Sequence, residues 1–138
     1  MDPAKALADL KQISSQVREA VIFDEGGTVV ASTLADGGTA ATMAEGAARL
    51  LEAAAEAAPE GAQRVVQLEA ALGDGSVALV REGDRTIAAT TAPEPTIGLV
   101  FYDLRTCLRS LGDVEEKPKT RKKPSTTRRK KTDSGAAA

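Results

Sequence analysis

Two adjacent carboxylates, Asp24 and Glu25, are the first residues in this sequence whose types and spacing could do chemistry. Paired carboxylates can hold a divalent cation or share general acid and base work. Here they precede Gly26 and Gly27 between two β-rich runs, and the two glycines supply the positive φ angles of a tight hairpin turn. Carboxylates at a hairpin tip are usually solvated turn residues. We therefore expect neither a metal site nor a catalytic pair here.

A glycine-rich segment, residues 73–78, matches the G-x-G-x-x-A pattern of dinucleotide-binding loops. In such loops the pyrophosphate rests on the N-terminus of the helix that follows. The segment here leads into a run with the two-residue period of a strand, so no helix N-terminus is available. We therefore expect a turn at this position and no nucleotide site.

The single cysteine, Cys107, stands near Arg105 and Arg109, and neighbouring cations can lower the pKa of a thiol. It also lies one position off an apolar helical stripe, which favours a partly buried and unreactive cysteine. One cysteine cannot form a disulfide within the chain. A chain without histidine has no Ser-His-Asp triad, no Cys-His pair and no Cys/His zinc site. The sequence thus excludes these catalytic and zinc-binding arrangements, and we expect no cofactor or metal.

Charge divides the 138 residues into two parts, although the formal net charge of the whole chain is only -2. Residues 1–116 carry 9 positive and 19 negative charges, whereas residues 117–138 carry 9 positive charges and one negative charge. No apolar period continues past residue 112, so we expect a folded domain over residues 1–112 and a disordered tail over residues 113–138. The tail is expected to bind anions through its cations, which are Lys117, Lys119, Arg121, Lys122, Lys123, Arg128, Arg129, Lys130 and Lys131.

Three helices, predicted from the spacing of apolar side chains, must position these residues. The first begins after the N-cap residue Asp2. The second occupies the alanine-rich stretch between residues 38 and 58, where Thr42 and Glu45 have the spacing of a capping box. The third begins after Thr96 and ends at Gly112, a residue type that is common just past the end of a helix.

Five short strands are predicted over residues 20–23, 28–32, 64–72, 77–81 and 86–91. Short turns join the first two strands to each other and the last three to one another, and strands joined in this way must be antiparallel. The element order is helix, strand, strand, helix, strand, strand, strand, helix. It predicts an α+β fold in which three helices pack on a five-stranded antiparallel sheet.

The predicted core is thin, because 26 residues are alanine and only three are aromatic. A domain of this size with so few large side chains is expected to gain part of its burial from a partner subunit. The second helix carries alanine on several faces. That composition either permits close approach of another helix or reflects the high helix propensity of alanine, and the residues alone leave both interpretations open.

Three segments, residues 19–32, 79–84 and 95–100, carry a resemblance in their hydrophobic pattern and turns. Over about residues 3–112 the chain resembles the Roadblock/dynein light chain family. The resemblance implies a profilin-like αβ-sandwich that forms a homodimer. The second helix and the third strand pair with their counterparts in the other copy, and the strand pairing produces one continuous sheet across the dimer. It favours the close-approach interpretation of the second helix, and the dimer interface that it implies consists of Met43, Ala47, Leu50, Ala54, Val66 and Leu68.

Members of this family act as regulators or scaffolds for Ras-like small GTPases. The resemblance therefore implies a non-enzymatic homodimer that binds or modulates such a GTPase, alone or within a signalling complex. An alternative from another class is a nucleic-acid-associated protein whose basic tail contacts phosphates. A third possibility is that the tail pairs with the acidic body within the dimer.

Membrane insertion is not expected. The apolar runs are a few residues long, far below the roughly 18 residues that a membrane-spanning helix needs. No signal pattern is present at the N-terminus of the sequence. We therefore expect a soluble, cytoplasmic protein.

Overall fold

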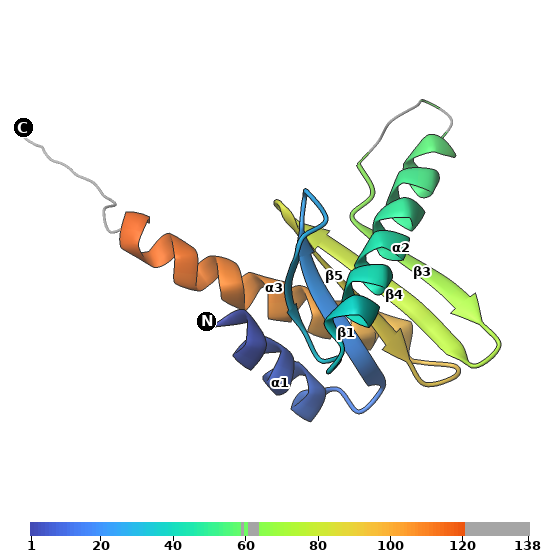
Figure 1. Ribbon diagram of the computed structural model, residues 1–138, viewed down its shortest axis with the longest axis horizontal. Helices are drawn as coiled ribbons and strands as arrows, with labels where there is room; N and C mark the ends of the chain where they lie inside the picture. The colour runs from blue at the N-terminus through green and yellow to red at the C-terminus, as the bar shows by residue number, and fades with distance from the viewer. Residues whose placement is uncertain (59, 61–63, 121–138) are drawn as a thin grey trace, which may run out of the picture.

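The computed structural model describes residues 1–58, 60 and 64–120 (Figure 1). The order of elements is the predicted one, and the α+β fold class is confirmed. In chain order the elements are α1 (Pro3–Ile13), β1 (Val17–Asp24), β2 (Val29–Ser32), α2 (Gly37–Glu56), β3 (Gln67–Leu72), β4 (Gly75–Glu82), β5 (Arg85–Thr91) and α3 (Ile97–Thr120).

The five strands form one antiparallel sheet in the order β2-β1-β5-β4-β3. Leu79 pairs directly with Leu68 on one side and with Ala88 on the other, and Ala88 pairs with Val21. Side chains of directly paired residues point to the same face, so these four form an apolar row across the sheet. The edges of the sheet are β2 and β3.

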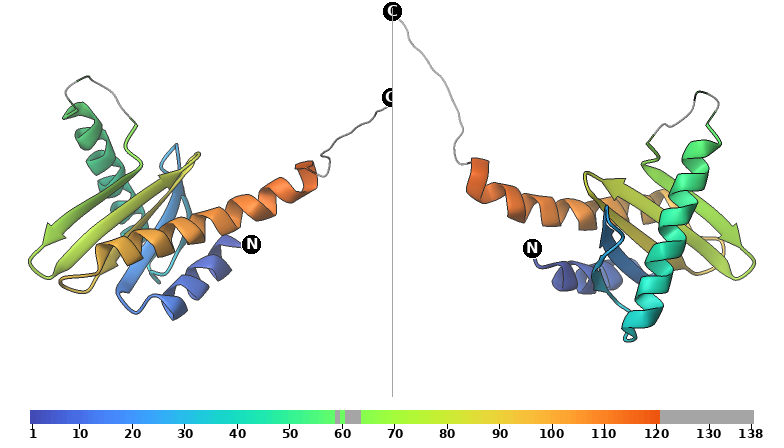
Figure 2. Two further views of the ribbon diagram at one scale, coloured as in Figure 1. Left: turned by 180° about the vertical axis from the view of Figure 1, so that it is seen from behind. Right: turned by 45° about the horizontal axis from the view of Figure 1, so that its top comes forward.

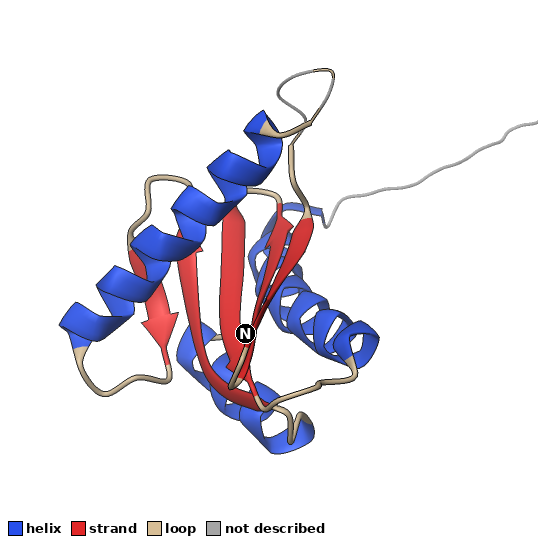
Figure 3. Cartoon of the chain, turned by 90° about the vertical axis from the view of Figure 1, so that its right-hand side faces the viewer, coloured by secondary structure: helices blue, strands red, loops and turns tan. Residues whose placement is uncertain are grey.

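The helices lie in two layers, one on each face of the sheet (Figure 3). Helices α1 and α3 share one face, and their buried residues form a core cluster with residues of the strands that point that way, such as Ile22 and Val80. Helix α2 covers the other face and packs on Val21, Phe23 and Leu79. The alternation of side chains along β1 and β4 supplies both clusters, because successive residues of a strand face opposite sides.

The start of α2 differs from the prediction. The predicted capping box is wrong, because Thr42 lies inside the helix, where its hydroxyl donates to the carbonyl of Gly38 at 3.1 Å. The N-cap is Asp36, whose carboxylate accepts from the backbone N–H of Thr39 at 3.1 Å. Two glycines at the first helical positions concealed this start, since glycine has a low helix propensity. The first helix does begin as predicted, with the Asp2 side chain as its N-cap.

The end of α3 also differs, because the helix continues to Thr120 and the predicted end at Gly112 is wrong. Glycine inside a helix costs only about 1 kcal/mol relative to alanine, so it does not force an end. Views from behind and from above show α3 running along the sheet and beyond the N-terminus of α1 (Figure 2).

Within the described ranges, no helix combines the length and the apolar character that crossing a membrane requires.

Candidate functional site

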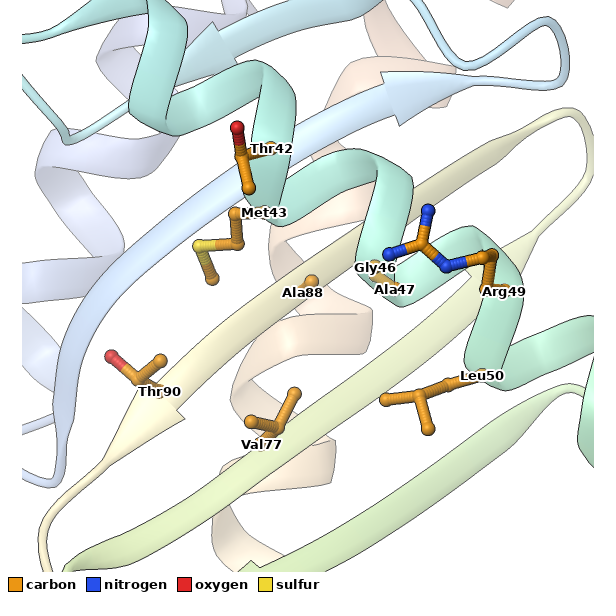
Figure 4. Close-up of a pocket in the computed structure, with 9 residues that line it drawn as sticks. All are labelled: Thr42, Met43, Gly46, Ala47, Arg49, Leu50, Val77, Ala88 and Thr90. Carbon is orange, nitrogen blue, oxygen red and sulfur yellow. The ribbon is translucent and has the colours of Figure 1, made fainter.

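A groove of about 510 Å³ runs between α2 and the strands β4 and β5 (Figure 4). Met43 and Leu50 reach from α2 toward the sheet, and Val77 and Thr90 rise from the strands toward the helix. The groove exists because α2 contacts β1, β2 and β5 and leaves much of the β3–β4 half of this face uncovered. Its lining residues are Thr42, Met43, Gly46, Ala47, Arg49, Leu50, Val77, Ala88 and Thr90.

The side of α2 that borders the groove carries few charges. Thr39, Met43, Gly46, Leu50 and Ala53 recur at helical spacing along it, and none of them is charged. The three glutamates of α2 also recur at helical spacing, but on a separate and exposed stripe that consists of Glu45, Glu52 and Glu56. Arg49, which also lines the groove, is charged. A side with few charges on an otherwise acidic helix is typical of a surface that another protein covers.

The strand β3, which lies next to β4 at one edge of the sheet, has an unprotected edge. It pairs with β4 on one side only. Leu68 and Ala70 on its α2-facing side are half-buried, and Leu72 is 64% exposed. Edge strands usually carry lysine, proline or a bulge that prevents pairing with other chains. Residues 67–72 contain no lysine or proline, and their pairing with β4 has no irregularity, so this edge is open to strand addition.

The six predicted interface residues fall into three groups in the structure. Met43, Ala47 and Leu50 meet around the groove. Leu68 packs on the same apolar cluster as Met43. The remaining two, Ala54 and Val66, do not line the groove: Ala54 is half-buried one turn further along α2, and Val66 is 56% exposed just before β3.

Ala47 was predicted to lie in the dimer interface, but its side chain faces the core of its own domain. It is only 3% exposed and belongs to the core cluster between α2 and the sheet, together with Ala44 and Leu51. Leu50 is 37% exposed and Met43 is half-buried, so these two offer more surface to a partner.

Several residues that line the groove were not identified from the sequence. Val77, Ala88 and Thr90 reach it through the register of β4 and β5, and no spacing along the chain reveals that register. Gly46 could have been identified from the sequence, because glycine is unfavourable in the interior of a helix. Glycine in a helix interior costs about 1 kcal/mol relative to alanine, and a Cβ added at Gly46 would meet nothing within 4 Å. Packing within the described part of the chain therefore gives no reason for the glycine.

The carboxylates at the β1–β2 turn are turn residues, as predicted. The carboxylate of Asp24 accepts from the backbone N–H groups of Gly26 at 3.0 Å and Thr28 at 2.9 Å, and Glu25 pairs with Arg64 at 3.3 Å. Only Gly27 of the two glycines has a positive φ, so the prediction of two such residues is wrong. In the part of the chain that the structure describes, no three His, Cys, Asp or Glu side chains gather closely enough to hold a metal ion.

Cys107 is buried between α1 and α3, and burial, together with the charge of Asp9, raises the pKa of its thiol from 9.0 to about 11. Because the folded state holds the proton more tightly than the unfolded state, this group's contribution to stability is complete below about pH 9 and is lost as the pH rises toward 11. We expect native protein at pH 8 to react with a thiol reagent such as DTNB far more slowly than unfolded protein. Equal rates for native and urea-unfolded protein would contradict this burial.

The predicted anion-binding tail is largely beyond the described part of the chain. Lys117 and Lys119 belong to the last turns of α3. The other cations lie outside the described residues, namely Arg121, Lys122, Lys123, Arg128, Arg129, Lys130 and Lys131. Anion binding and disorder of the tail therefore stay predictions.

Comparison with known proteins identifies the fold. No family model and no curated protein matches the sequence. The Roadblock/LC7 domain from Streptomyces avermitilis matches with a TM-score of 0.73 at 18% identity, over 83% of this chain and 98% of that chain. Myxococcus xanthus MglB matches with a TM-score of 0.69 at 14% identity, over 83% and 88% of the two chains. An MglB structure with a tetrameric arrangement gives the same TM-score at 15% identity, over 83% and 88%.

LokiProfilin2, in its complex with rabbit actin, matches with a TM-score of 0.57 at 14% identity, over 80% of this chain and 95% of that chain. The fold is thus profilin-like in its general architecture. The higher TM-scores belong to the Roadblock and MglB structures, which share the arrangement of three helices around the five-stranded sheet over nearly their full length. The chain therefore has the fold of a Roadblock domain.

Proposed function

We propose that this chain is a non-enzymatic, homodimeric regulatory or scaffold protein that binds a Ras-like small GTPase. The observation that carries the dimer is the mostly apolar groove between α2 and β4–β5, on the side of the sheet where β3, the neighbour of β4, leaves an open edge. In this proposal the interface includes Met43, Ala47 and Leu50 around the groove and Ala54, Val66 and Leu68 next to it.

A second copy of this chain suits this surface, because a single two-fold axis can cover both the β3 edge and the groove side of α2. Two β3 strands related by such an axis pair as antiparallel strands and extend the sheet. The same axis sets the two α2 helices side by side on one face. Small residues on the groove side of α2, such as Gly46 and Ala53, let the two helices approach closely. The added burial also compensates for the small number of large side chains in the protomer core.

Replacing Leu50 with glutamate is expected to separate the dimer into folded monomers. The side chain is 37% exposed in the protomer, so the substitution costs the fold little. In the dimer the new carboxylate would be desolvated near its symmetry mate, and the dissociation constant should rise by about 100-fold or more. Analytical ultracentrifugation over a concentration series measures the dissociation constant directly.

The matched control is Glu45→Gln, on the exposed glutamate stripe of the same helix, which should leave the dimer unchanged. Circular dichroism of Leu50→Glu should give the same spectrum as the parent protein. A Leu50→Glu variant that remains a dimer of undiminished affinity would refute the proposed interface. A parent protein that sediments as a monomer at all concentrations would refute the dimer itself.

The GTPase partner is supported by the fold. The Roadblock domain and MglB structures match nearly their entire length to this chain, and the resemblance of the sequence implies a regulator or scaffold. Such a protein adjusts or recruits a GTPase and leaves nucleotide hydrolysis to it. The direct test is a fluorescence titration of the dimer with small GTPases encoded near its gene, each loaded with GDP or with a non-hydrolysable GTP analogue. Preference for one nucleotide state is expected of a regulator, equal binding of a scaffold, and no binding in either state would reject the GTPase assignment.

A further inference from the structure

A second pocket, of about 460 Å³, lies between the C-terminal half of α2 and the β1–β2 turn. Arg64, three residues before β3, and the adjoining ends of β4 and β5 complete it, and these segments meet at the upper end of the sheet in Figure 1. The pocket shares no lining residue with the groove of the proposed dimer interface. It is lined by Phe23, Asp24, Glu25, Gly27, Ala48, Leu51, Glu52, Ala55, Arg64, Arg81 and Thr86.

Arg81 is the cation inside this pocket that has no carboxylate partner among the described residues. Its Nε and one Nη group both donate to the carbonyl of Val65, at 3.0 and 2.8 Å, which holds the side chain in place and leaves other N–H groups unused. Partial burial and the nearby charge of Arg64 lower the pKa of Arg81, and the charge of Glu25 acts in the opposite direction. Arg64, by contrast, is paired with Glu25 at 3.3 Å. The guanidinium of Arg81 is thus fixed and partly desolvated, and the carboxylate that attracts it is already paired with Arg64, so an anion is a favourable ligand for it.

Thr86 is a second, independent indication of a ligand in this pocket. It is 5% exposed, and its hydroxyl makes no hydrogen bond within the described part of the chain. Thr86 pairs directly with Arg81 on β4 and with Phe23 on β1, so these three side chains stand side by side on the α2 face. A buried hydroxyl without a partner is unfavourable, and valine would fill the same space in a strand without this cost. A ligand oxygen would satisfy the hydroxyl.

We propose that this pocket binds an aliphatic monocarboxylate, with its carboxylate on Arg81 and Thr86 and its chain along Phe23 and Leu51. A planar carboxylate can accept two N–H groups from one guanidinium. Phe23 and Leu51 are buried residues of the α2-side core, and they provide an apolar wall.

The acidic residues of the pocket decide between a monoanion and a more highly charged ligand. Asp24 accepts two backbone hydrogen bonds and Glu25 is paired with Arg64, so both are already engaged. Glu52 lies on α2 and is exposed. With three carboxylates in the lining, a dianionic phosphate meets more repulsion than a single carboxylate does. Glu52 is therefore a residue that weakens anion binding.

The test is titration of the full-length protein with hexanoate, followed by ¹H–¹⁵N NMR of the backbone around residues 81 and 86. We expect saturable shifts with a dissociation constant of about 1 mM or lower, and no saturable shifts with 1-hexanol or inorganic phosphate. Arg81→Gln should weaken hexanoate binding by about tenfold or more, since it removes a charged hydrogen bond. Glu52→Gln should strengthen binding several-fold, because it removes a repelling charge.

Thr86→Val keeps the test decisive if Arg81→Gln fails to fold. The valine variant should be at least as stable as the parent protein and should bind hexanoate several-fold more weakly. Arg18→Gln, an exposed arginine whose side chain donates to the carbonyl of Asp74, serves as the control and should bind as the parent does. The proposal is overturned if hexanoate gives no saturable shifts up to about 10 mM, or if Thr86→Val and Arg81→Gln both bind hexanoate like the parent. Sedimentation of the same samples reports separately on the dimer.

Discussion

Substituting arginine for Ala47 is expected to unfold the protomer. Ala47 is 3% exposed, and it packs from α2 against the apolar row of the sheet that contains Leu79 and Ala88. An arginine there must either bury its charge without a partner or push α2 off the sheet, and the free energy of unfolding should fall by about 4 kcal/mol or more. Circular dichroism with urea denaturation measures this loss.

Leu50→Arg, one turn further along α2, is the informative comparison, because the side chain at this position is 37% exposed and the variant should stay folded. The pair of variants separates two effects that a single substitution would merge. An unfolded Ala47 variant reports the packing of α2 on its own sheet, whereas a folded, monomeric Leu50 variant reports the contact with a second copy. If Ala47→Arg were folded with unchanged stability, α2 could not lie on the sheet as described.

Gly75→Ala is expected to be the most damaging single-methyl change in the protein. Gly75 begins β4 with φ +150°, a conformation that residues with a side chain rarely adopt. A Cβ at this position would collide with the carbonyl oxygen of Thr91, at the end of the neighbouring strand β5. Because a backbone atom cannot move aside as a side chain can, we expect a loss of about 3 kcal/mol in the free energy of unfolding, measured by urea denaturation.

Gly73→Ala provides the matched control two residues earlier in the same turn. A Cβ at Gly73 meets nothing within 4 Å, and its φ lies outside the range that favours glycine. This variant should be within about 0.5 kcal/mol of the parent protein. Similar losses for the two variants would mean that the close approach of β4 to Thr91 is not what the glycine permits.

The elements were predictable where one physical signal dominated. The two-residue period of β3, β4 and β5 and the short turns between them fixed the antiparallel arrangement. The helix ends were less predictable, because competing signals had similar strength. Two glycines obscured the N-cap at Asp36, and a glycine at position 112 looked like the end of a helix that continues to Thr120.

The sites depended on information that a single strand or helix does not contain. Alanine is common on several faces of α2, so the sequence alone did not show that Ala47 faces the sheet while Leu50 borders the groove. The pairing of Arg81 with Thr86 arises from the register of β4 and β5. Its importance depends on where α2 leaves the face of the sheet open, and that is a property of the packed layers.

The direction of α3 has a consequence for valency. Its later turns pack on α1, where the N-terminal ammonium group donates to the carbonyl of Ser110 at 3.3 Å, and α1 contacts β1 and β2 at the edge opposite β3. A dimer joined through β3, as proposed, would therefore place the C-terminal ends of its two α3 helices, which carry Lys117 and Lys119, far apart at opposite ends. If the basic tail binds anions as the sequence predicts, such a dimer would be bivalent toward acidic partners, and its avidity would depend on the spacing of their binding points as well as on the strength of each contact.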